Sequence, residues 1–329
     1  MHIKKEEVNL LKGFAILAVI LSHANGMEHL LGNFSAFLTS NVCRIGMASF
    51  LFLSGYGLYK SYLYKGVFGF WKKRFFRILI PYWIWQIILI PGVLLLGLTP
   101  EAEFSFRMLD GLAVLGIYPV HRIDPTMWYV SYILFLYAIF WCIVRWGKRE
   151  YHVAISIIFL GILLIVTPFW WKNAGYCCGM FPLGMIFACI ENEEKQGKTV
   201  GVLGMFMCLL LMATMLWVWS FFPNTHFLVQ NVFFGTMTIL AILISRQLAQ
   251  WKIFHVVQCV GELSYGIYLV EYYLIVRVAG KLRFLLKVPA TFSWIVLLGV
   301  TVVVVLGLFM LRKVQHEISE KRQKYRTLN

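Results

Sequence analysis

Hydrophobic and polar positions are arranged in blocks, with long apolar runs separated by short connections that carry most of the charge. A helix needs about 20 predominantly apolar residues to cross the hydrocarbon core of a bilayer. The apolar segments that approach this length lie at 10–26, 36–62, 75–98, 127–146, 151–168, 174–190, 200–222, 228–245, 259–279 and 290–311. The pattern therefore predicts an all-α integral membrane protein, a bundle of about ten transmembrane helices.

The composition agrees with this class. Of the 329 residues, 60% are hydrophobic and 14% are charged, whereas soluble domains carry about 25% charged residues. The first apolar segment lacks the small-residue cleavage site of a signal peptide, and no internal repeat is visible. We expect residues 1–329 to form one membrane-embedded domain without a separate soluble domain.

The distribution of basic residues predicts the orientation. The formal net charge of +15 does not indicate a nucleic-acid partner, because the basic residues lie between apolar segments rather than on one soluble surface. With the N-terminus inside, 22 of the 30 Lys and Arg residues fall on the inner side. The positive-inside rule then predicts that both termini are cytoplasmic. The outer connection 277–287, with four basic residues, is an exception that this rule does not explain.

The first apolar segment carries the most informative side chain. His23 ends an apolar run and lies eleven residues beyond Lys12, about 16 Å along a helix and roughly half the hydrocarbon thickness. An ionisable group at that depth is costly and indicates function, and imidazole exchanges protons near neutral pH. The alternative is that the membrane ends early and His23 lies at the interface.

A basic stretch precedes the third segment. Lys73, Arg74 and Arg77 lie directly before the apolar run that begins with Ile78. On an α-helix Arg74 and Arg77 share a face, and two guanidinium groups can bind phosphate in a forked geometry. An ordinary positive-inside anchor is the other interpretation, and from this stretch alone the anchor is favoured.

A few polar residues lie inside the other apolar segments. Arg44 is expected to pair with Glu28 or to extend toward the interface, and the small residues around Ser54 favour close helix packing. Glu271 lies in an apolar run, so it must be partnered, protonated or facing water; Arg44, or His23 through a water molecule, are its expected partners. The seven cysteines show no paired metal-ligand spacing, so no metal site is expected.

The longest polar connection, 99–126, lies on the predicted outer side. Its default interpretation is a structural surface loop, and a lid or an acceptor-binding wall is the alternative.

Five motifs occur in an order that is similar to one known family. The chain resembles the acyltransferase-3 family of integral membrane acyltransferases over nearly its whole length. The matching stretches are LLKGFAILAVILSHA, FLFLSGYGLY, KKRFFRILIPYW, TMWYVSYILFLY and GELSYGIYLVE. The chain departs from the family pattern at Asn9, where many members have Asp, at Lys12, where many have Arg, and at Glu271, where a histidine is common.

The resemblance implies transfer of an acyl group, most often acetyl, from cytoplasmic acyl-CoA to a hydroxyl of a glycan or other cell-envelope molecule, in the bacterial cytoplasmic membrane. His23 would act as the base, either in direct transfer or through an acyl-histidine. Glu28, or less readily another carboxylate, would orient it once the helix breaks at Asn25-Gly26.

The other expected site residues follow from the same resemblance. Lys73, Arg74 and Arg77 would hold the phosphates of acyl-CoA, a donor substrate rather than a permanently bound cofactor. The substrate path would include Arg44, Ser54, Trp128, Ser264, Tyr265 and Glu271. The expected partners are acyl-CoA, the envelope acceptor and the lipid bilayer, and the sequence is compatible with a homo-oligomer.

The alternative is a non-enzymatic membrane protein that transports a glycan or an acylated metabolite along a path lined by His23, Arg44 and Glu271. The basic cluster at the predicted cytoplasmic boundary favours the enzyme, and the almost uncharged fifth to eighth segments argue against transport. A glycan polymerase would need a large outer loop with catalytic charge, for which 99–126 is only a modest candidate.

Overall fold

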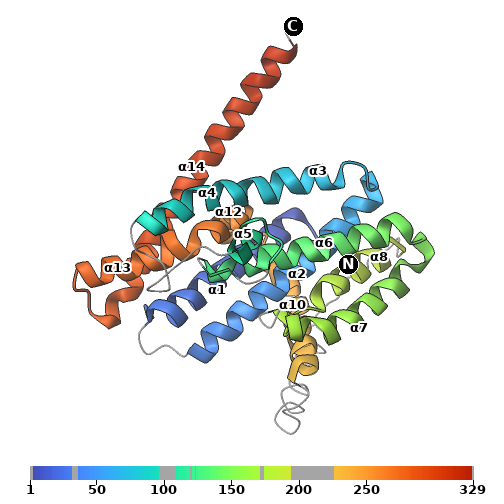
Figure 1. The fold of residues 1–329 in the computed structure, drawn as a ribbon, viewed down its shortest axis with the longest axis horizontal. Coiled ribbons are helices and arrows are strands. Elements are labelled where there is room, and N and C mark those ends of the chain that lie inside the picture. Colours follow the sequence, from blue (N-terminus) through green and yellow to red (C-terminus); the bar gives the residue numbers. More distant parts are fainter. Residues whose placement is uncertain are drawn as a thin grey trace.

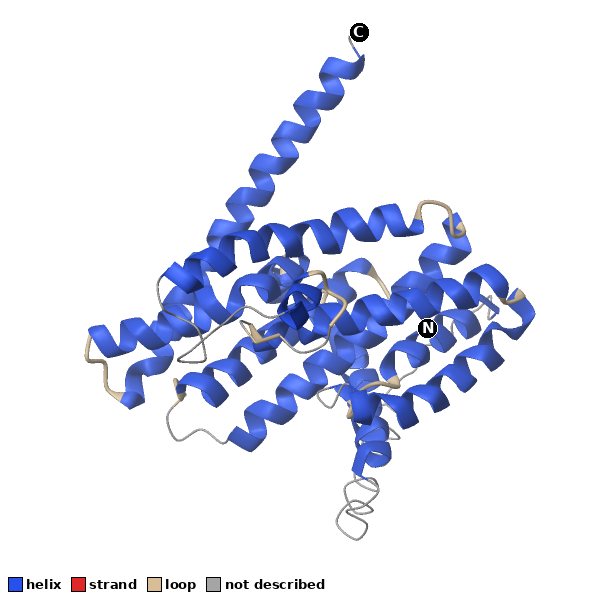
Figure 2. Cartoon of the chain, in the orientation of Figure 1, coloured by secondary structure: helices blue, strands red, loops and turns tan. Residues whose placement is uncertain are grey.

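The computed structural model describes residues 3–31, 36–95, 108–118, 121–122, 124–170, 174–193 and 226–327. Throughout these residues the chain is helical, with short turns and no strand (Figures 1 and 2). The all-α fold class predicted from the apolar blocks is therefore confirmed. Because 194–225 is outside the described residues, the segment expected at 200–222 has no structural account.

Seven helical stretches are long and apolar enough to cross a membrane, and a pair of helices bent by 58° would make eight. The seven run over Lys5–Gly26, Ser40–Lys65, Phe70–Gly92, Pro125–Trp146, Arg149–Pro168, Phe227–Leu248 and Ser293–Gln315. The bent pair is Lys252–Glu262 with Ser264–Leu285, where one span was expected at 259–279. The expected sixth span is represented by a shorter apolar helix, Met180–Glu191. The chain is a multi-pass membrane protein, and the total of about ten spans stays a prediction.

The helical elements follow one another with short connections. In chain order they are α1 (Lys5–Glu28), α2 (Ala36–Lys65), α3 (Phe70–Arg74), η1 (Phe75–Leu79), α4 (Ile80–Leu95), α5 (Met108–Val114), η2 (Pro125–Met127), α6 (Trp128–Trp146), η3 (Arg149–Tyr151), α7 (His152–Trp170), α8 (Met180–Glu193), α10 (His226–Leu248), η6 (Lys252–Phe254), α11 (His255–Glu262), α12 (Ser264–Val270), η7 (Glu271–Arg277), α13 (Val278–Leu285), η8 (Ala290–Phe292) and α14 (Ser293–Thr327). Most lie along one long axis, whereas α14 projects away from the bundle (Figure 1).

Glycines let the central helices approach closely. A Cβ added at Gly55 of α2 would collide with the carbonyl oxygen of Phe181 in α8, and one at Gly184 of α8 would collide with that of Phe52 in α2. At Gly46 an added Cβ would lie 2.8 Å from the carbonyl oxygen of Ala15 in α1. Membrane helices associate mainly through such close packing, because lipid offers no hydrophobic gain. The small residues of the second segment thus serve helix packing, as their sequence indicates.

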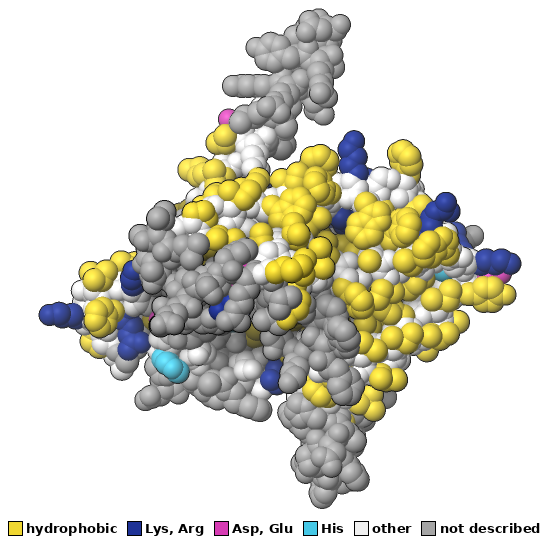
Figure 3. Space-filling model, viewed as in Figure 1, with side chains coloured by type: hydrophobic (Ala, Val, Ile, Leu, Met, Phe, Trp, Pro, Cys, Tyr) yellow, Lys and Arg dark blue, Asp and Glu magenta, His cyan; other side chains and the backbone are white. Residues whose placement is uncertain are grey.

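The surface divides into apolar sides and charged ends. Hydrophobic side chains cover much of the face shown in Figure 3, and Lys and Arg side chains gather toward its two ends. The spans in α4, α7 and α14 bury only 17%, 28% and 11% of their apolar windows, so these helices present their side chains to lipid. We call the end with Lys5 the inner end, because charge predicts it to be cytoplasmic, and the end with α13 the outer end.

Ion pairs at the outer end account for part of the basic connection 277–287. Arg277 Nη1 lies 2.8 Å from Glu28 Oε1, and Arg283 donates to the carbonyl oxygens of Glu28 and His29. These carbonyls end α1, where a helix dipole favours cations. Half of the basic residues in this connection therefore fasten the end of α1 to η7 and α13.

Candidate functional site

His23 and Glu271 form the closest ionisable pair at the centre of the candidate site. His23 Nδ1 lies 2.6 Å from Glu271 Oε1. The carboxylate is fully buried, while 21% of the His23 side chain stays accessible. One side of the imidazole is thus held by a carboxylate and the other is open. This arrangement fixes the ring and leaves its second nitrogen for another partner.

The backbone around Glu271 explains why its side chain reaches His23. Helix α12 ends at Val270, and the π-helical segment η7 begins at Glu271. A π-helical turn contains an extra residue and therefore rotates the following side chains relative to an α-helix; such turns are frequent at functional sites. The acidic group is 248 residues from its partner along the chain, and packing of α1 against η7 brings the two together.

The expected contact between His23 and Glu28 is wrong. Helix α1 continues unbroken to Glu28, so the expected break at Asn25-Gly26 is absent. Five residues along an α-helix point Glu28 away from the His23 face, and its carboxylate pairs with Arg277 instead. The expected water bridge from Glu271 to His23 is replaced by a direct contact, and Arg44 is not its partner.

A cavity of about 310 Å³ opens beside His23. Its walls come from α1, α2, the turn before α6, the start of α6, the turn before α8, and α12. The lining residues are Val19, Ser22, His23, Ser40, Cys43, Arg44, Met47, Pro125, Thr126, Trp128, Tyr176 and Tyr268. Of the residues expected along a substrate path, Arg44 and Trp128 lie in this wall. The cavity is of the size that small-molecule sites have, about 300–1,000 Å³.

Asp124 is a buried acid next to this cavity that the sequence did not single out. Its Oδ1 accepts hydrogen bonds from the backbone N–H and hydroxyl of Thr126 at 3.0 and 2.6 Å, while Oδ2 is buried without a partner among the described residues. Burial raises the pKa of Asp124 to about 7. The Tyr268 hydroxyl donates to the Thr126 carbonyl oxygen at 2.5 Å, which fixes this turn at the cavity wall. The one feature of the sequence that could have indicated Asp124 is its place directly before Pro125 in a loop.

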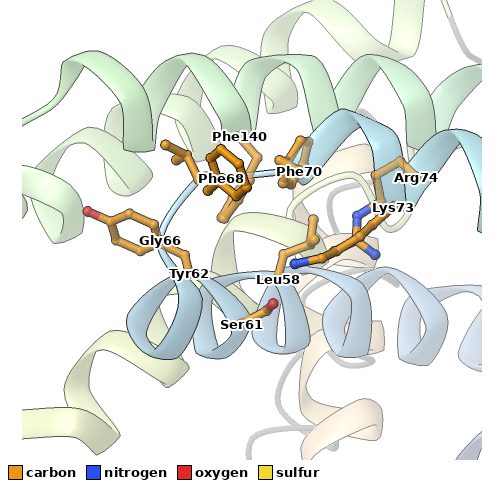
Figure 4. Close-up of a pocket in the computed structure, with 10 residues that line it drawn as sticks. Leu58, Ser61, Tyr62, Gly66, Phe68, Phe70, Lys73, Arg74 and Phe140 are labelled. Atoms are coloured by element: carbon orange, nitrogen blue, oxygen red, sulfur yellow. The ribbon is translucent and has the colours of Figure 1, made fainter. Parts of the chain in front are cut away.

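A second hollow, of about 10 Å³ and so with room for about one water molecule, lies near the inner end, between α2, α3 and α6. Lys73 and Arg74 line it, together with Leu58, Ser61, Tyr62, Gly66, Val67, Phe68, Phe70 and Phe140. Lys73 and Arg74 extend from α3 toward α2 (Figure 4). The Arg74 guanidinium lies over the rings of Phe70 and Tyr137, at 5.2 and 5.5 Å, and its Nε is buried without a hydrogen-bond partner among the described residues.

Arg77 does not share this position. It is exposed and absent from the lining, because the π-helical segment η1 begins at Phe75 and changes the angle between residues three apart. The structure therefore places Lys73 and Arg74 at one hollow, whereas Arg77 is outside its lining but still close enough to Arg74 for an electrostatic interaction. That the two arginines share a face for phosphate binding stays a prediction.

Three tyrosines lie between the two hollows. Tyr137 lies under Arg74, and Ser54 lies beside the hydroxyls of Tyr137 and Tyr129. The ring of Tyr129 contacts that of Tyr268 at 5.7 Å, and Tyr268 lines the His23 cavity. Tyr137, Tyr129 and Tyr268 thus form an aromatic column with polar hydroxyls along the bundle.

The remaining expected path residues lie beside this column. Ser264 is buried. The Tyr265 hydroxyl donates to the Ile78 carbonyl oxygen at 2.8 Å, and its ring stacks on Tyr268 at 6.4 Å. Within the described ranges, no group of three or more His, Cys, Asp or Glu side chains is placed to hold a metal ion.

Together, the fold and site define a helical membrane protein with a carboxylate-paired histidine at a cavity and a cationic hollow at the opposite end. A family model described as "Acyltransferase domain" (Acyl_transf_3) matches residues 5–312. The chain belongs to this acyltransferase family, which confirms the resemblance read from its motifs. Neither the curated proteins nor the solved structures gave a match to the chain.

Proposed function

We propose that the protein transfers an acyl group, most simply acetyl, from cytoplasmic acyl-CoA to a hydroxyl of a glycan or other cell-envelope acceptor. The observation that carries the proposal is the direct contact of His23 with Glu271 at a cavity wall. A histidine oriented by a buried carboxylate is suited to general-base catalysis of acyl transfer. Membership of the acyltransferase family supports the same reaction type.

The pair assigns different tasks to the two nitrogens of His23. As a carboxylate, Glu271 accepts a hydrogen bond from Nδ1–H, so Nε2 is free to accept a proton. The acceptor oxygen attacks the thioester carbonyl carbon while its proton passes to Nε2. The intermediate then expels the CoA sulfur, which takes the proton from the imidazolium. Glu271 stabilises that imidazolium between the two steps.

Lys73 and Arg74 are suited to the phosphates of the donor. Both are cations at one small hollow, and the unpartnered Nε of Arg74 offers a buried donor. Hydrogen bonds from guanidinium to phosphate are strong because both groups are charged. In this proposal Arg77 contributes only to the surrounding positive field, because it does not line the hollow.

The two hollows are separated by a distance that suits the donor. Leu58 lines the inner hollow and Met47 lines the cavity; eleven residues of α2 between them correspond to about 16 Å. An extended phosphopantetheine arm has a comparable length. The thioester would then lie beside His23 while the nucleotide stays at the inner end, and the arm would pass along Tyr137, Tyr129 and Tyr268.

The acceptor would approach from the outer end. His23 lies in the last turns of α1, toward the end that charge predicts to be outside, and its cavity is lined by the first half of α2. In a bacterial cytoplasmic membrane this position faces the envelope, where hydroxyl-bearing glycans are assembled. The proposed acceptor class follows from this placement together with the family resemblance.

The test uses purified full-length protein in lipid nanodiscs with acetyl-CoA labelled in the acetyl group. We expect CoA release that increases when extracted envelope glycans are added, with label recovered in the glycan as an ester. His23→Gln should abolish both signals, whereas His255→Gln, an exposed histidine away from both hollows, should keep them. CoA release no faster than in the His23→Gln protein would refute the proposal.

A further inference from the structure

Arg44 faces the same cavity as His23 from the opposing helix α2. Its guanidinium carbon lies 5.0 Å from the centroid of the Tyr176 ring, and Tyr176 also lines the cavity. Stacking on an aromatic face holds the planar group in place while leaving its N–H donors at the edge. Arg44 is thus a positioned cation in the wall of the candidate acceptor site.

Among the described residues no carboxylate pairs with Arg44. Other acids near the helix ends have cations of their own: the pairs are Glu7–Arg246, Glu28–Arg277, Asp110–Arg122, Glu191–Lys60 and Glu262–Arg312. Glu271 is held by His23. A half-buried guanidinium inside a membrane bundle is costly without a compensating partner. Arg44 therefore lines the cavity without a carboxylate partner of its own among the described residues.

We propose that the acceptor is an anionic hydroxyl compound, a sugar that carries a carboxylate or phosphate, and that Arg44 binds this oxyanion. The inference rests on the proposed function and specifies its substrate class. Carboxylate and phosphate both match the fork of guanidinium donors, so the shared chemistry is a forked oxyanion.

The other lining residues fit the rest of such a sugar. Ser22 and Ser40 offer hydroxyl groups, and the Trp128 ring supplies an apolar face. With its oxyanion on Arg44 in α2, the sugar would present another hydroxyl to His23 across the cavity in α1. Arg44 would therefore select and position the acceptor without taking part in proton transfer.

The test measures binding to full-length protein in nanodiscs without acyl-CoA. The probes are methyl glucoside, methyl glucuronoside and methyl glucoside 6-phosphate, which differ only at the sixth carbon. Calorimetry should give about tenfold or greater tighter binding for at least one charged probe than for the neutral one, as expected for one charge-assisted contact. The stronger of the two charged probes identifies the oxyanion.

Three variants connect this preference to Arg44. Arg44→Gln should remove it, and Arg44→Lys should keep part of it because charge remains while the fork is lost. Arg283→Gln removes a cation at the outer end that does not line the cavity and should leave the preference intact. Thermal unfolding of each variant shows whether it is folded.

Two outcomes overturn the inference. The first is wild-type protein that binds the three probes equally or binds none of them. The second is an Arg44→Gln protein that keeps the preference but turns over more slowly, which would place Arg44 at the reacting carbonyl. Failure of the proposed function is seen separately, as absence of CoA release from acetyl-CoA.

Discussion

Glu271 occupies a fully buried position, and its Oε1 contacts His23 while its Oε2 has no hydrogen-bond partner among the described residues. A buried carboxylate with one unsatisfied oxygen costs free energy that a structural role alone would not require. We therefore interpret the contact as a functional one: it orients the ring of His23 at a cost to the stability of the fold. The acid at this position holds the imidazole of His23, the proposed catalytic base, by a direct contact.

Asp124 gives a prediction for the dependence of stability on pH. Its pKa in the folded protein is about 7, against 3.8 ordinarily, so the folded state keeps a proton that the unfolded state loses above pH 4. Stability should fall as the pH rises from about 4 to 7 and level off above that. Asp124→Asn should remove this component and stabilise the protein at pH 8 by up to about 4 kcal/mol.

Thermal unfolding of wild type and Asp124→Asn across pH 4 to 8 measures the effect. Thr126→Val, which removes only the hydroxyl donor to the carboxylate, serves as a control that should keep the pH slope. Parallel curves for wild type and Asp124→Asn would show that Asp124 is ionised throughout this range.

The sequence predicted a functional role for a single residue when the residue was a polar group among apolar neighbours. His23 and Arg44 stand out as polar groups in apolar runs, and the structure brings both to one cavity. The partner of His23 was predicted only in part. Glu271 was expected to reach His23 through water and Glu28 to orient the ring, because the sequence does not show how closely α1 and η7 pack. Glu28 is only five residues from His23 in the sequence, but helical geometry points its side chain away from the His23 face, and it pairs with Arg277.

At the scale of elements, two π-helical segments begin next to the residues of interest. Phe75–Leu79 follows Arg74, and Glu271–Arg277 begins with the acid that contacts His23. The apolar pattern predicts where helices lie. It does not distinguish an α-helical turn from a π-helical one, because the same apolar residues can form either. This is why the sequence could not predict that Arg74 lines the hollow and Arg77 does not.

The two arginines should therefore respond differently to substitution. Arg74→Lys should weaken CoA binding by about tenfold, because it loses the fork at the hollow while keeping the charge. Arg77→Lys should change the affinity little. Calorimetry with CoA measures both, with the exposed Lys65→Arg as control. Equal affinities for wild type and Arg74→Lys would make Arg74 a topological anchor.

The contact between α2 and α8 gives a prediction about packing. Gly184→Leu places a side chain against the Phe52 carbonyl and should destabilise the protein by several kcal/mol or prevent folding, because overpacking separates the helices. Gly57→Ala, on α2 where no atom lies within 4 Å of an added Cβ, should be nearly neutral. Thermal unfolding in detergent compares the two, and similar stability for both would contradict the close contact.

At the scale of the whole molecule, charged contacts fasten both ends of the bundle. Glu262 joins Lys5 of α1 to Arg312 of α14 at the inner end, at 3.5 and 2.9 Å, and Glu28 joins α1 to Arg277 at the outer end. Exposed ion pairs contribute little singly, but these connect helices distant in sequence. The positive-inside rule counts basic residues and does not consider such contacts. It therefore could not explain the basic residues of the outer connection 277–287.

The bundle also places two cationic sites at different depths, Arg74 at the inner hollow and Arg44 at the outer cavity, with tyrosines between them.

The hydrophobic blocks predicted the membrane class and most helices. They could not predict that α11 and α12 meet at an angle of 58°, because the break at Leu263 leaves hydrophobicity unchanged. That bend leads the chain into η7 and thus to Glu271.

The central claim is that His23 and Glu271 act as one unit in acyl transfer. The most direct measurement is a double-mutant cycle on the turnover of labelled acetyl-CoA by His23→Gln, Glu271→Gln and the double variant, each checked for thermal stability. We expect His23→Gln to lower turnover by about 10²–10⁴-fold, Glu271→Gln to lower it substantially, and the double variant to be no slower than His23→Gln. Near-normal turnover in folded His23→Gln protein, or losses that multiply in the double variant, would contradict the account.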